Sequence, residues 1–322
     1  MSAAAKIGGA RPIAVILPSF KMLAGTRGAI AAINLSKGLH MSSMRRRIPA
    51  WGAFFTAVLV TFAFAGVAGA GAATLPDVTV AVTPTSATVG GALESGAVNI
   101  AVSDTGVKEA NVVVFQIKPG VTLAEVEAFA KSKKAAHDPN TTVKYGSIVF
   151  DVEANPGKAT EAATVLEAGE YVVLVGEGEK PVQLRTHFTV KASKAPAALP
   201  APAATEKTIE FAFRGPTTLH DGELVLFENE GFLVHMDIAF PVKNVAAAKT
   251  AVKDLLSGNE KGLGKLIAGA PVAFSGPLSH GSSQEETVSA KPGIYVQACF
   301  METQDGRDHT RLGMERVIKI TK

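Results

Sequence analysis

Apolar and polar residues alternate with a period of two in many short segments of the chain after residue 74. The runs VNIAVS at 98–103 and ELVLF at 223–227 show this alternation, and β-branched and aromatic residues are frequent in such runs. Gly, Asn or Asp stands at the turns between them. This pattern is typical of strands that bury one face, so we predict an all-β fold.

Two longer segments have the period of a helix instead. They span residues 121–134 and 244–256, and each lies between predicted strands. The apolar residues of the first segment recur at helical spacing and fall on one face: Leu123, Val126, Phe129 and Ala130. We predict one short helix in each half of the chain.

The order of these segments repeats once along the chain. The most persuasive match pairs EAGEYVVLV at 167–175 with KPGIYVQAC at 291–299, and each lies at the same place in its own series of strands and helix. A repeat of this length indicates domain duplication. We therefore expect two tandem Greek-key β-sandwiches, each with one short inserted helix.

The repeat and the composition predict the domain boundaries. The two domains would span residues 74–193 and 208–322. Residues 194–207 are rich in Ala and Pro and lack core-forming side chains, which is typical of a stiff, extended linker.

Residues 1–73 have the features of a leader with a signal peptide. A basic segment at 44–47 (MRRR) precedes an apolar run at 51–67, and small residues suited to signal peptidase follow at 68–73. We expect an exported protein, extracellular or in the bacterial cell envelope. An uncleaved membrane anchor is the alternative. Because residues 1–40 precede the basic segment, the start is expected at Met41 or Met44.

The charge of the chain is unevenly distributed. The formal net charge is +3, but residues 1–73 hold eight Lys and Arg residues and no Asp or Glu. The remainder has 24 basic and 29 acidic side chains, a net charge of −5. This balance argues against nucleic acid as a partner.

The chain has one cysteine, Cys299, which belongs to a set of four residues that together indicate a metal site. An exported protein with a single cysteine forms no internal disulfide, so its thiol must be buried or bound to metal. His309 and Met314 follow Cys299, and His235 lies upstream. One thiolate, two imidazoles and a thioether are the ligand types of a type 1 copper site.

The spacing of these residues resembles the cupredoxin family. The matching motifs are Asn-x-Gly-x-x-x-His at 229–235, a Cys-to-His loop that leads to Gly313-Met314, and the turn Pro-Gly-x-Tyr at 292–295. The resemblance implies one copper ion with equatorial ligands His235, Cys299 and His309 and axial ligand Met314. It also implies that backbone amides near Asn229 hydrogen-bond the sulfur. The loop of nine residues between Cys299 and His309 is longer than in the short-loop electron carriers.

Simpler interpretations of single residues stay open. A buried Cys is often only a small apolar residue, and His235 is compatible with an ordinary core position. The ordered set of four favours metal. The first repeat has Val175 in place of Cys299 and no His near Asn111, so we expect it to bind no copper and to be structural or a docking module. The other histidines after the leader fall in loops or a closing strand: His137, His187, His220 and His280.

We expect one-electron transfer to an unidentified redox partner protein, through an exposed edge of His309. The alternative is a non-redox binding or structural module, or a copper-handling protein. The loop of a copper-handling protein would use Met301 and the acidic residues Glu302, Asp305 and Asp308. An enzyme is not indicated, because no further cluster of histidines suggests a catalytic copper.

Overall fold

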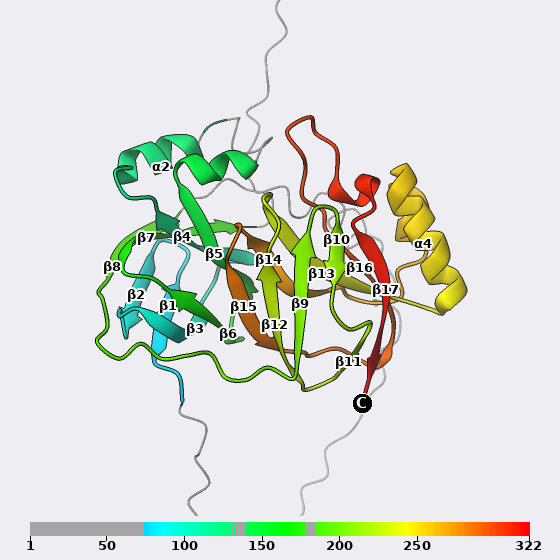
Figure 1. The fold of residues 1–322 in the computed structure, drawn as a ribbon, viewed down its shortest axis with the longest axis horizontal. Helices are drawn as coiled ribbons and strands as arrows, with labels where there is room; N and C mark the ends of the chain where they lie inside the picture. Colours follow the sequence, from blue (N-terminus) through cyan, green and yellow to red (C-terminus); the bar gives the residue numbers. More distant parts are fainter. Residues whose placement is uncertain (1–73, 131, 133–138, 178–183) are drawn as a thin grey trace, which may run out of the picture. The chain divides into compact units, whose positions relative to one another are not determined.

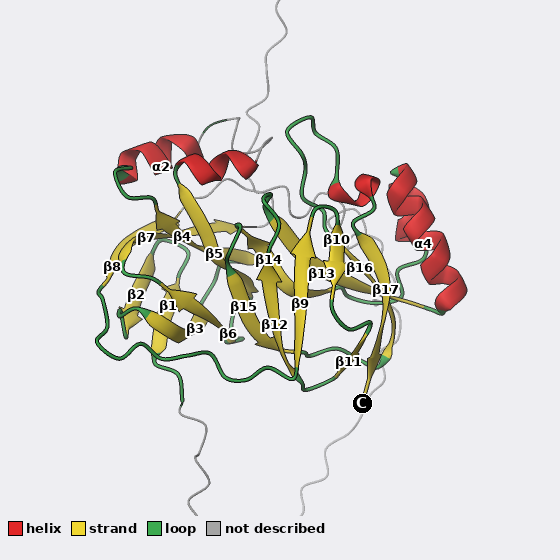
Figure 2. Ribbon diagram, viewed as in Figure 1, coloured by secondary structure: helices red, strands yellow, loops and turns green. Residues whose placement is uncertain are grey.

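Strands are the main secondary structure of the described residues, as the alternating pattern predicts (Figures 1 and 2). The computed structural model describes residues 74–130, 132, 139–177 and 184–322. The predicted leader, residues 1–73, and His137 lie outside the described residues. Within the described ranges, no helix is long and apolar enough to cross a membrane.

The first repeat contains strands β1 to β8, helix α2 and the 3₁₀ helix η1. Their bounds are β1 Asp77–Val82, β2 Ala87–Gly91, β3 Gly96–Asp104, β4 Ala110–Ile117, α2 Leu123–Ala130, η1 Pro139–Lys144, β5 Gly146–Ala154, β6 Thr160–Leu166, β7 Gly169–Glu177 and β8 Leu184–Val190. Strand β1 alternates strictly between exposed and buried positions, so its valines face the core of a sandwich.

The second repeat contains strands β9 to β17, helices α4 and α5, and the 3₁₀ helix η2. Their bounds are β9 Ala204–Ile209, β10 Ala212–Arg214, β11 Thr218–His220, β12 Leu224–Asn229, β13 His235–Val242, α4 Val245–Ser257, α5 Glu260–Gly264, β14 Val272–Leu278, β15 Ser283–Thr287, β16 Gly293–Ala298, η2 His309–Leu312 and β17 Glu315–Thr321.

The two repeats have the same strand order. The sheet β5-β4-β7-β8 of the first corresponds to β14-β13-β16-β17 of the second, which β11 extends at one edge. Two matched side chains support the correspondence: the Tyr171 hydroxyl donates to Glu167 O and the Tyr295 hydroxyl donates to Lys291 O, both at 2.9 Å. The all-β sandwich fold is confirmed.

The remaining strands of both repeats form one continuous sheet of eight strands. Its order is β10-β9-β12-β15-β6-β3-β1-β2, and the junction is the antiparallel pair of β15 with β6. Strand β5 also lies against β14, where Ser279 N–H donates to Ile148 O and Ile148 N–H donates to the Ser279 hydroxyl. The repeats are therefore joined through backbone as well as side-chain contacts.

Both predicted helices are present, and capping residues fix where they begin. At α2, the Thr122 hydroxyl accepts from Glu125 N–H while the Glu125 carboxylate accepts from Thr122 N–H, which is a capping box. At α4, the Asn244 side chain accepts from Ala247 N–H. Helix α4 buries one apolar stripe against β13, β16 and β17, beside which it lies in Figure 1.

The Ala- and Pro-rich segment between the repeats is packed along the first repeat. Ala97 N–H donates to Ala197 O, and Gly96, at φ 126°, leaves no room for a side chain beside Pro196. The last four residues of the predicted linker, 204–207, belong to strand β9.

Candidate metal centre

Three buried side chains that the motifs singled out converge at one end of the second sandwich. The Cys299 Sγ lies 3.4 Å from His309 Nδ1 and 3.8 Å from His235 Nδ1, and the two Nδ1 atoms are 3.1 Å apart. All three residues are at most 1% exposed. Each therefore directs one donor atom toward a common point.

Strand pairing brings the first two together. His235 is the first residue of β13 and Cys299 directly follows β16, and these strands are antiparallel neighbours with Ile238 opposite Ala298. Antiparallel strands place the start of one beside the end of the other. The sheet therefore fixes these two candidate ligands side by side, although the residues are 64 positions apart.

The long Cys-to-His loop folds back on itself. His309 N–H donates to Met301 O at 2.8 Å, Glu302 forms a β-bridge with Asp308, and Gly306 N–H closes a turn onto Thr303 O. Residues 302–308 thus form a hairpin-like loop whose first and last residues are paired. For this reason a nine-residue loop still returns His309 to Cys299.

Met314 lies in the same apolar cluster as Cys299. Its side chain is fully buried, and its backbone O accepts from Cys299 N–H at 3.2 Å. Met236 and Met301 are buried in that cluster as well.

The donor set fits a first-row metal ion. A point equidistant from the Sγ and the two Nδ1 atoms lies about 2.0 Å from each, close to the bond lengths of zinc to imidazole and thiolate. A structural zinc site takes four strong ligands, whereas a thioether is the weak fourth donor typical of type 1 copper. With the Met314 thioether in the same buried cluster, the residues match the donor types of such a copper site.

Burial keeps the three donors uncharged in the absence of metal. It lowers the pKa of His235 to about 4 and that of His309 to about 3, so both imidazoles are neutral at pH 7. It raises the pKa of the Cys299 thiol to about 12. A metal that binds the sulfur must displace this proton.

The Met236 N–H donates to the Cys299 sulfur at 3.4 Å, and the backbone of Met301 hydrogen-bonds the same sulfur. We expected this donor near Asn229. The Asn229 side chain instead organises the loop before His235, because it accepts from Gly231 N–H at 2.9 Å and donates to Leu233 O at 2.8 Å.

Glu210 contacts the far edge of the His235 ring and was not identified from the sequence. Its Oε1 lies 3.4 Å from His235 Nε2 and accepts from Leu233 N–H at 2.7 Å. Burial opposes ionisation of this carboxyl, but the hydrogen bond from Leu233 and the nearby His235 hold its pKa below the usual range. A carboxylate at Nε2 favours the tautomer with its proton there, which leaves Nδ1 free to bind metal.

The first repeat covers the site through Asn140, in η1. The Asn140 Oδ1 accepts from Val234 N–H at 2.8 Å, and its Nδ2 donates to Glu302 O at 3.3 Å. One amide therefore joins the segment before His235 to the loop after Cys299. Apolar residues of β4, β5 and β7 share a core with the site: Val113, Phe115, Ile117, Ile148 and Val172.

His309 presents no edge to solvent, contrary to our expectation. Its side chain is fully buried, its Nε2 has no hydrogen-bond partner, and the Phe211 ring packs against it edge-on with 5.0 Å between ring centres. The hairpin turns the charged residues of the loop outward and the imidazole inward. Asp305 pairs with Arg307 and Asp308 with Arg311.

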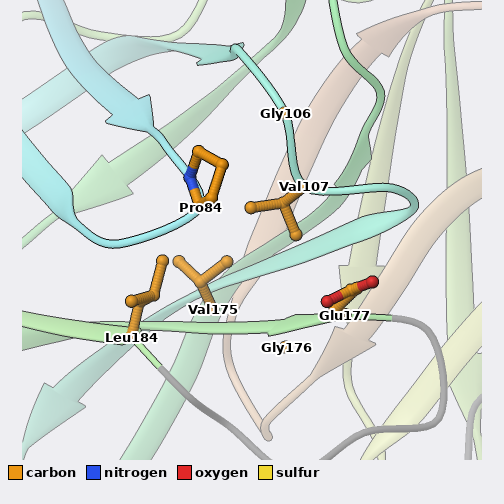
Figure 3. A pocket seen from close by; sticks show the side chains of 7 residues that line it. All are labelled: Pro84, Gly106, Val107, Val175, Gly176, Glu177 and Leu184. Carbon is orange, nitrogen blue, oxygen red and sulfur yellow. The ribbon is translucent and has the colours of Figure 1, made fainter.

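The corresponding end of the first repeat has apolar residues in place of the ligands. By strand register, Ala110 stands where the second repeat has His235, Val175 where it has Cys299, and Leu184 where it has Met314. Val175 and Leu184 line a cavity of about 60 Å³ with Pro84 and Val107 (Figure 3). This is far smaller than the roughly 300–1,000 Å³ of ordinary ligand pockets.

The remaining described histidines have other partners. His187 pairs with Glu170 at 2.6 Å in the closing strand β8, and His220 contacts Thr321 beside the chain end. His280 lies near the site, where its Nδ1 is 2.9 Å from Gly231 O.

Several solved copper proteins match part of this chain. Auracyanin B is 18% identical, over 38% of this chain and 93% of its own, with a TM-score of 0.24. Auracyanin A from Chloroflexus aurantiacus, a blue copper protein, is 20% identical; the match covers 36% of this chain and 96% of auracyanin A, with a TM-score of 0.22. A copper-containing nitrite reductase from Thermus scotoductus is 12% identical; the match covers 76% of this chain and 67% of the reductase, with a TM-score of 0.22. No protein-family model and no curated protein matches the sequence. Similarity at this level assigns no function, which must be argued from the site itself.

Proposed function

We propose that this protein is an exported, cupredoxin-like electron-transfer protein that binds one copper ion in its second repeat. The triangle of Cys299 Sγ, His235 Nδ1 and His309 Nδ1 carries the proposal, because three soft or borderline donors converge in a buried, apolar site. Met314 is proposed as the weak axial ligand. A bound copper ion would supply one-electron redox chemistry.

The residues around the site favour electron transfer over catalysis. The donors are held in place by the sheet, by the Met236 N–H on the sulfur and by Asn140, so little rearrangement is needed between oxidation states. The described residues offer no second histidine cluster for a catalytic metal. A redox partner protein is therefore part of the proposal.

Export is proposed from the leader and from the state of the cysteine. Residues 1–73 have the pattern of a signal peptide, and Cys299 is fully buried, which protects its thiol in an oxidising compartment.

The visible spectrum of the Cu(II)-loaded protein tests the proposal. We expect an intense thiolate-to-copper charge-transfer band and one copper per chain by elemental analysis, both lost in Cys299→Ala. His280→Ala, which changes a histidine outside the triangle, is the matched control and should keep the band. If the wild type binds copper but shows no charge-transfer band, or if Cys299→Ala binds as much copper as the wild type, the protein instead handles copper or has a structural role.

A further inference from the structure

Phe232 is an exposed aromatic residue in the loop between β12 and β13. Its side chain is 83% exposed, more than any other large apolar side chain in the described ranges. Its ring stacks on His280 with 5.5 Å between ring centres, and His280 Nδ1 lies 2.9 Å from Gly231 O. Single exposed apolar residues are common, so the position of this one matters.

That position is the outer edge of the candidate ligand His235. A side-chain carbon on Gly231 would lie 2.7 Å from His235 Nε2, so the Gly231 backbone is in contact with the imidazole edge that faces away from Cys299. Phe232 is the next residue. One glycine therefore separates a ligand ring from the exposed aromatic pair.

Both candidate ligand rings are buried, and what covers each of them differs. The Phe211 ring packs against His309, whereas the Gly231 backbone lies against the outer edge of His235. Because only this glycine separates His235 from the exposed Phe232, we take the His235 side as the place of electron exchange.

The charges around this loop are mainly negative. Glu210, Glu228 and Glu230 surround it, and Lys207 pairs with the last two at 3.7 and 2.6 Å. Arg214 lies opposite Lys207 on the neighbouring strand, which leaves a local excess of one negative charge. Residues 74–322 as a whole carry a net charge of −5.

We propose that the Phe232–His280 pair is the docking surface for a cationic redox protein. The exposed ring supplies the apolar contact, and the surrounding carboxylates attract and orient a basic partner. The inference rests on the proposed electron-transfer function and names the partner's chemistry and its place of contact.

Stopped-flow electron exchange between the copper-loaded protein and cytochrome c, a strongly basic redox protein, tests this surface. We expect a bimolecular rate constant that falls with added salt. Phe232→Ala should lower it severalfold and Glu230→Lys by about three- to tenfold, with the copper band unchanged. The matched controls are Leu256→Ala, an exposed apolar residue on α4, and Glu161→Lys, the same charge reversal in the first repeat. Both should stay within about twofold of the wild type.

Four results would overturn the assignment. If Phe232→Ala and Glu230→Lys keep both the copper band and the wild-type rate, the docking surface is wrong, but the proposed electron-transfer function stands. An equal loss in Glu161→Lys would mean that net charge, rather than this surface, controls the rate. A dimer by analytical ultracentrifugation that dissociates in Phe232→Ala would make a second copy of the chain the occupant. A wild type without the band or any electron exchange would refute the proposed function as well.

Discussion

The Asn140 side chain accepts a hydrogen bond at 2.8 Å from the backbone N–H of Val234, the residue before His235. Asn140 belongs to the first repeat, which has no ligands of its own at the corresponding end. Its amide also donates to Glu302 O, in the loop between Cys299 and His309. The first repeat therefore helps to hold both segments of the second repeat that carry the candidate ligands.

Asn140→Ala should weaken the site without removing a ligand. It leaves the Val234 N–H and the Glu302 carbonyl without this partner, at a cost of about 1–3 kcal/mol in the free energy of unfolding. We expect faster loss of copper to a chelator and a lower Tm. Asn155→Ala is the matched control, because its amide bonds only to the partly exposed Glu153 at 3.2 Å. Equal copper release from wild type and Asn140→Ala would show that the contact does not stabilise the site.

Glu210→Gln and Glu210→Ala separate charge from hydrogen bonding at His235. Gln keeps an acceptor near Nε2 but removes a negative charge beside the site, so the reduction potential should rise while the copper band persists. Ala removes the acceptor as well, and copper affinity should fall by about 10- to 100-fold. Glu228→Gln, on the same surface but paired with Lys207, is the control. Unchanged potential and affinity in both variants would show that Glu210 does not orient the ring.

Sequence reasoning succeeded where local patterns are sufficient. Period-two strands, two helical segments and the match of Tyr171 with Tyr295 predicted the fold and the repeat. The same match placed Val175 opposite Cys299, and strand register agrees. The spacing of His235, Cys299 and His309 was informative because strand pairing turns motif order into proximity.

Tertiary contacts without a local signal could not be predicted. Asn140 is 94 residues from Val234, and no feature of the sequence around it marks the contact. Glu210 lies in the turn between β9 and β10, and nothing in the sequence there marks its contact with His235. The prediction that His309 is exposed was wrong, because the loop before it forms a hairpin that turns the imidazole inward. The sequence of the loop alone does not predict that the hairpin and the neighbouring repeat bury this residue.

Asp151→Asn should flatten the pH dependence of stability. Asp151 is a residue of β5, and its side chain is buried against Gly276 of β14. Its Oδ1 accepts a hydrogen bond from the Asn111 side chain at 2.8 Å, and its Oδ2 has no hydrogen-bond partner. Burial raises its pKa from 3.8 to about 8. Between pH 3.8 and about 8, the folded state therefore holds a proton that the unfolded state has lost. The stability that this proton contributes falls as the pH rises through that range and is gone above pH 8. Asn keeps the shape but does not titrate.

Urea unfolding at pH 7 and pH 9 measures this effect. The wild type should lose more stability over that interval than Asp151→Asn, and the variant should be the more stable at pH 9. Asp305→Asn is the control, since its exposed carboxyl has a pKa lowered chiefly by the Thr303 hydroxyl and is ionised throughout. Parallel curves for wild type and Asp151→Asn would show that this carboxyl is ionised in the folded protein at pH 7.

Met314→Leu tests the proposed axial ligand with little change in packing. Leu stands at the corresponding position of the first repeat, as Leu184, and a buried Met-to-Leu change usually costs less than about 1.5 kcal/mol. The copper band should persist because the thiolate remains, while the potential should rise because a weak donor that favours Cu(II) is lost. Met301→Leu is the matched control: its thioether is equally buried in the same cluster but is not a proposed ligand. A potential that changes in Met301→Leu and not in Met314→Leu would transfer the axial role to Met301.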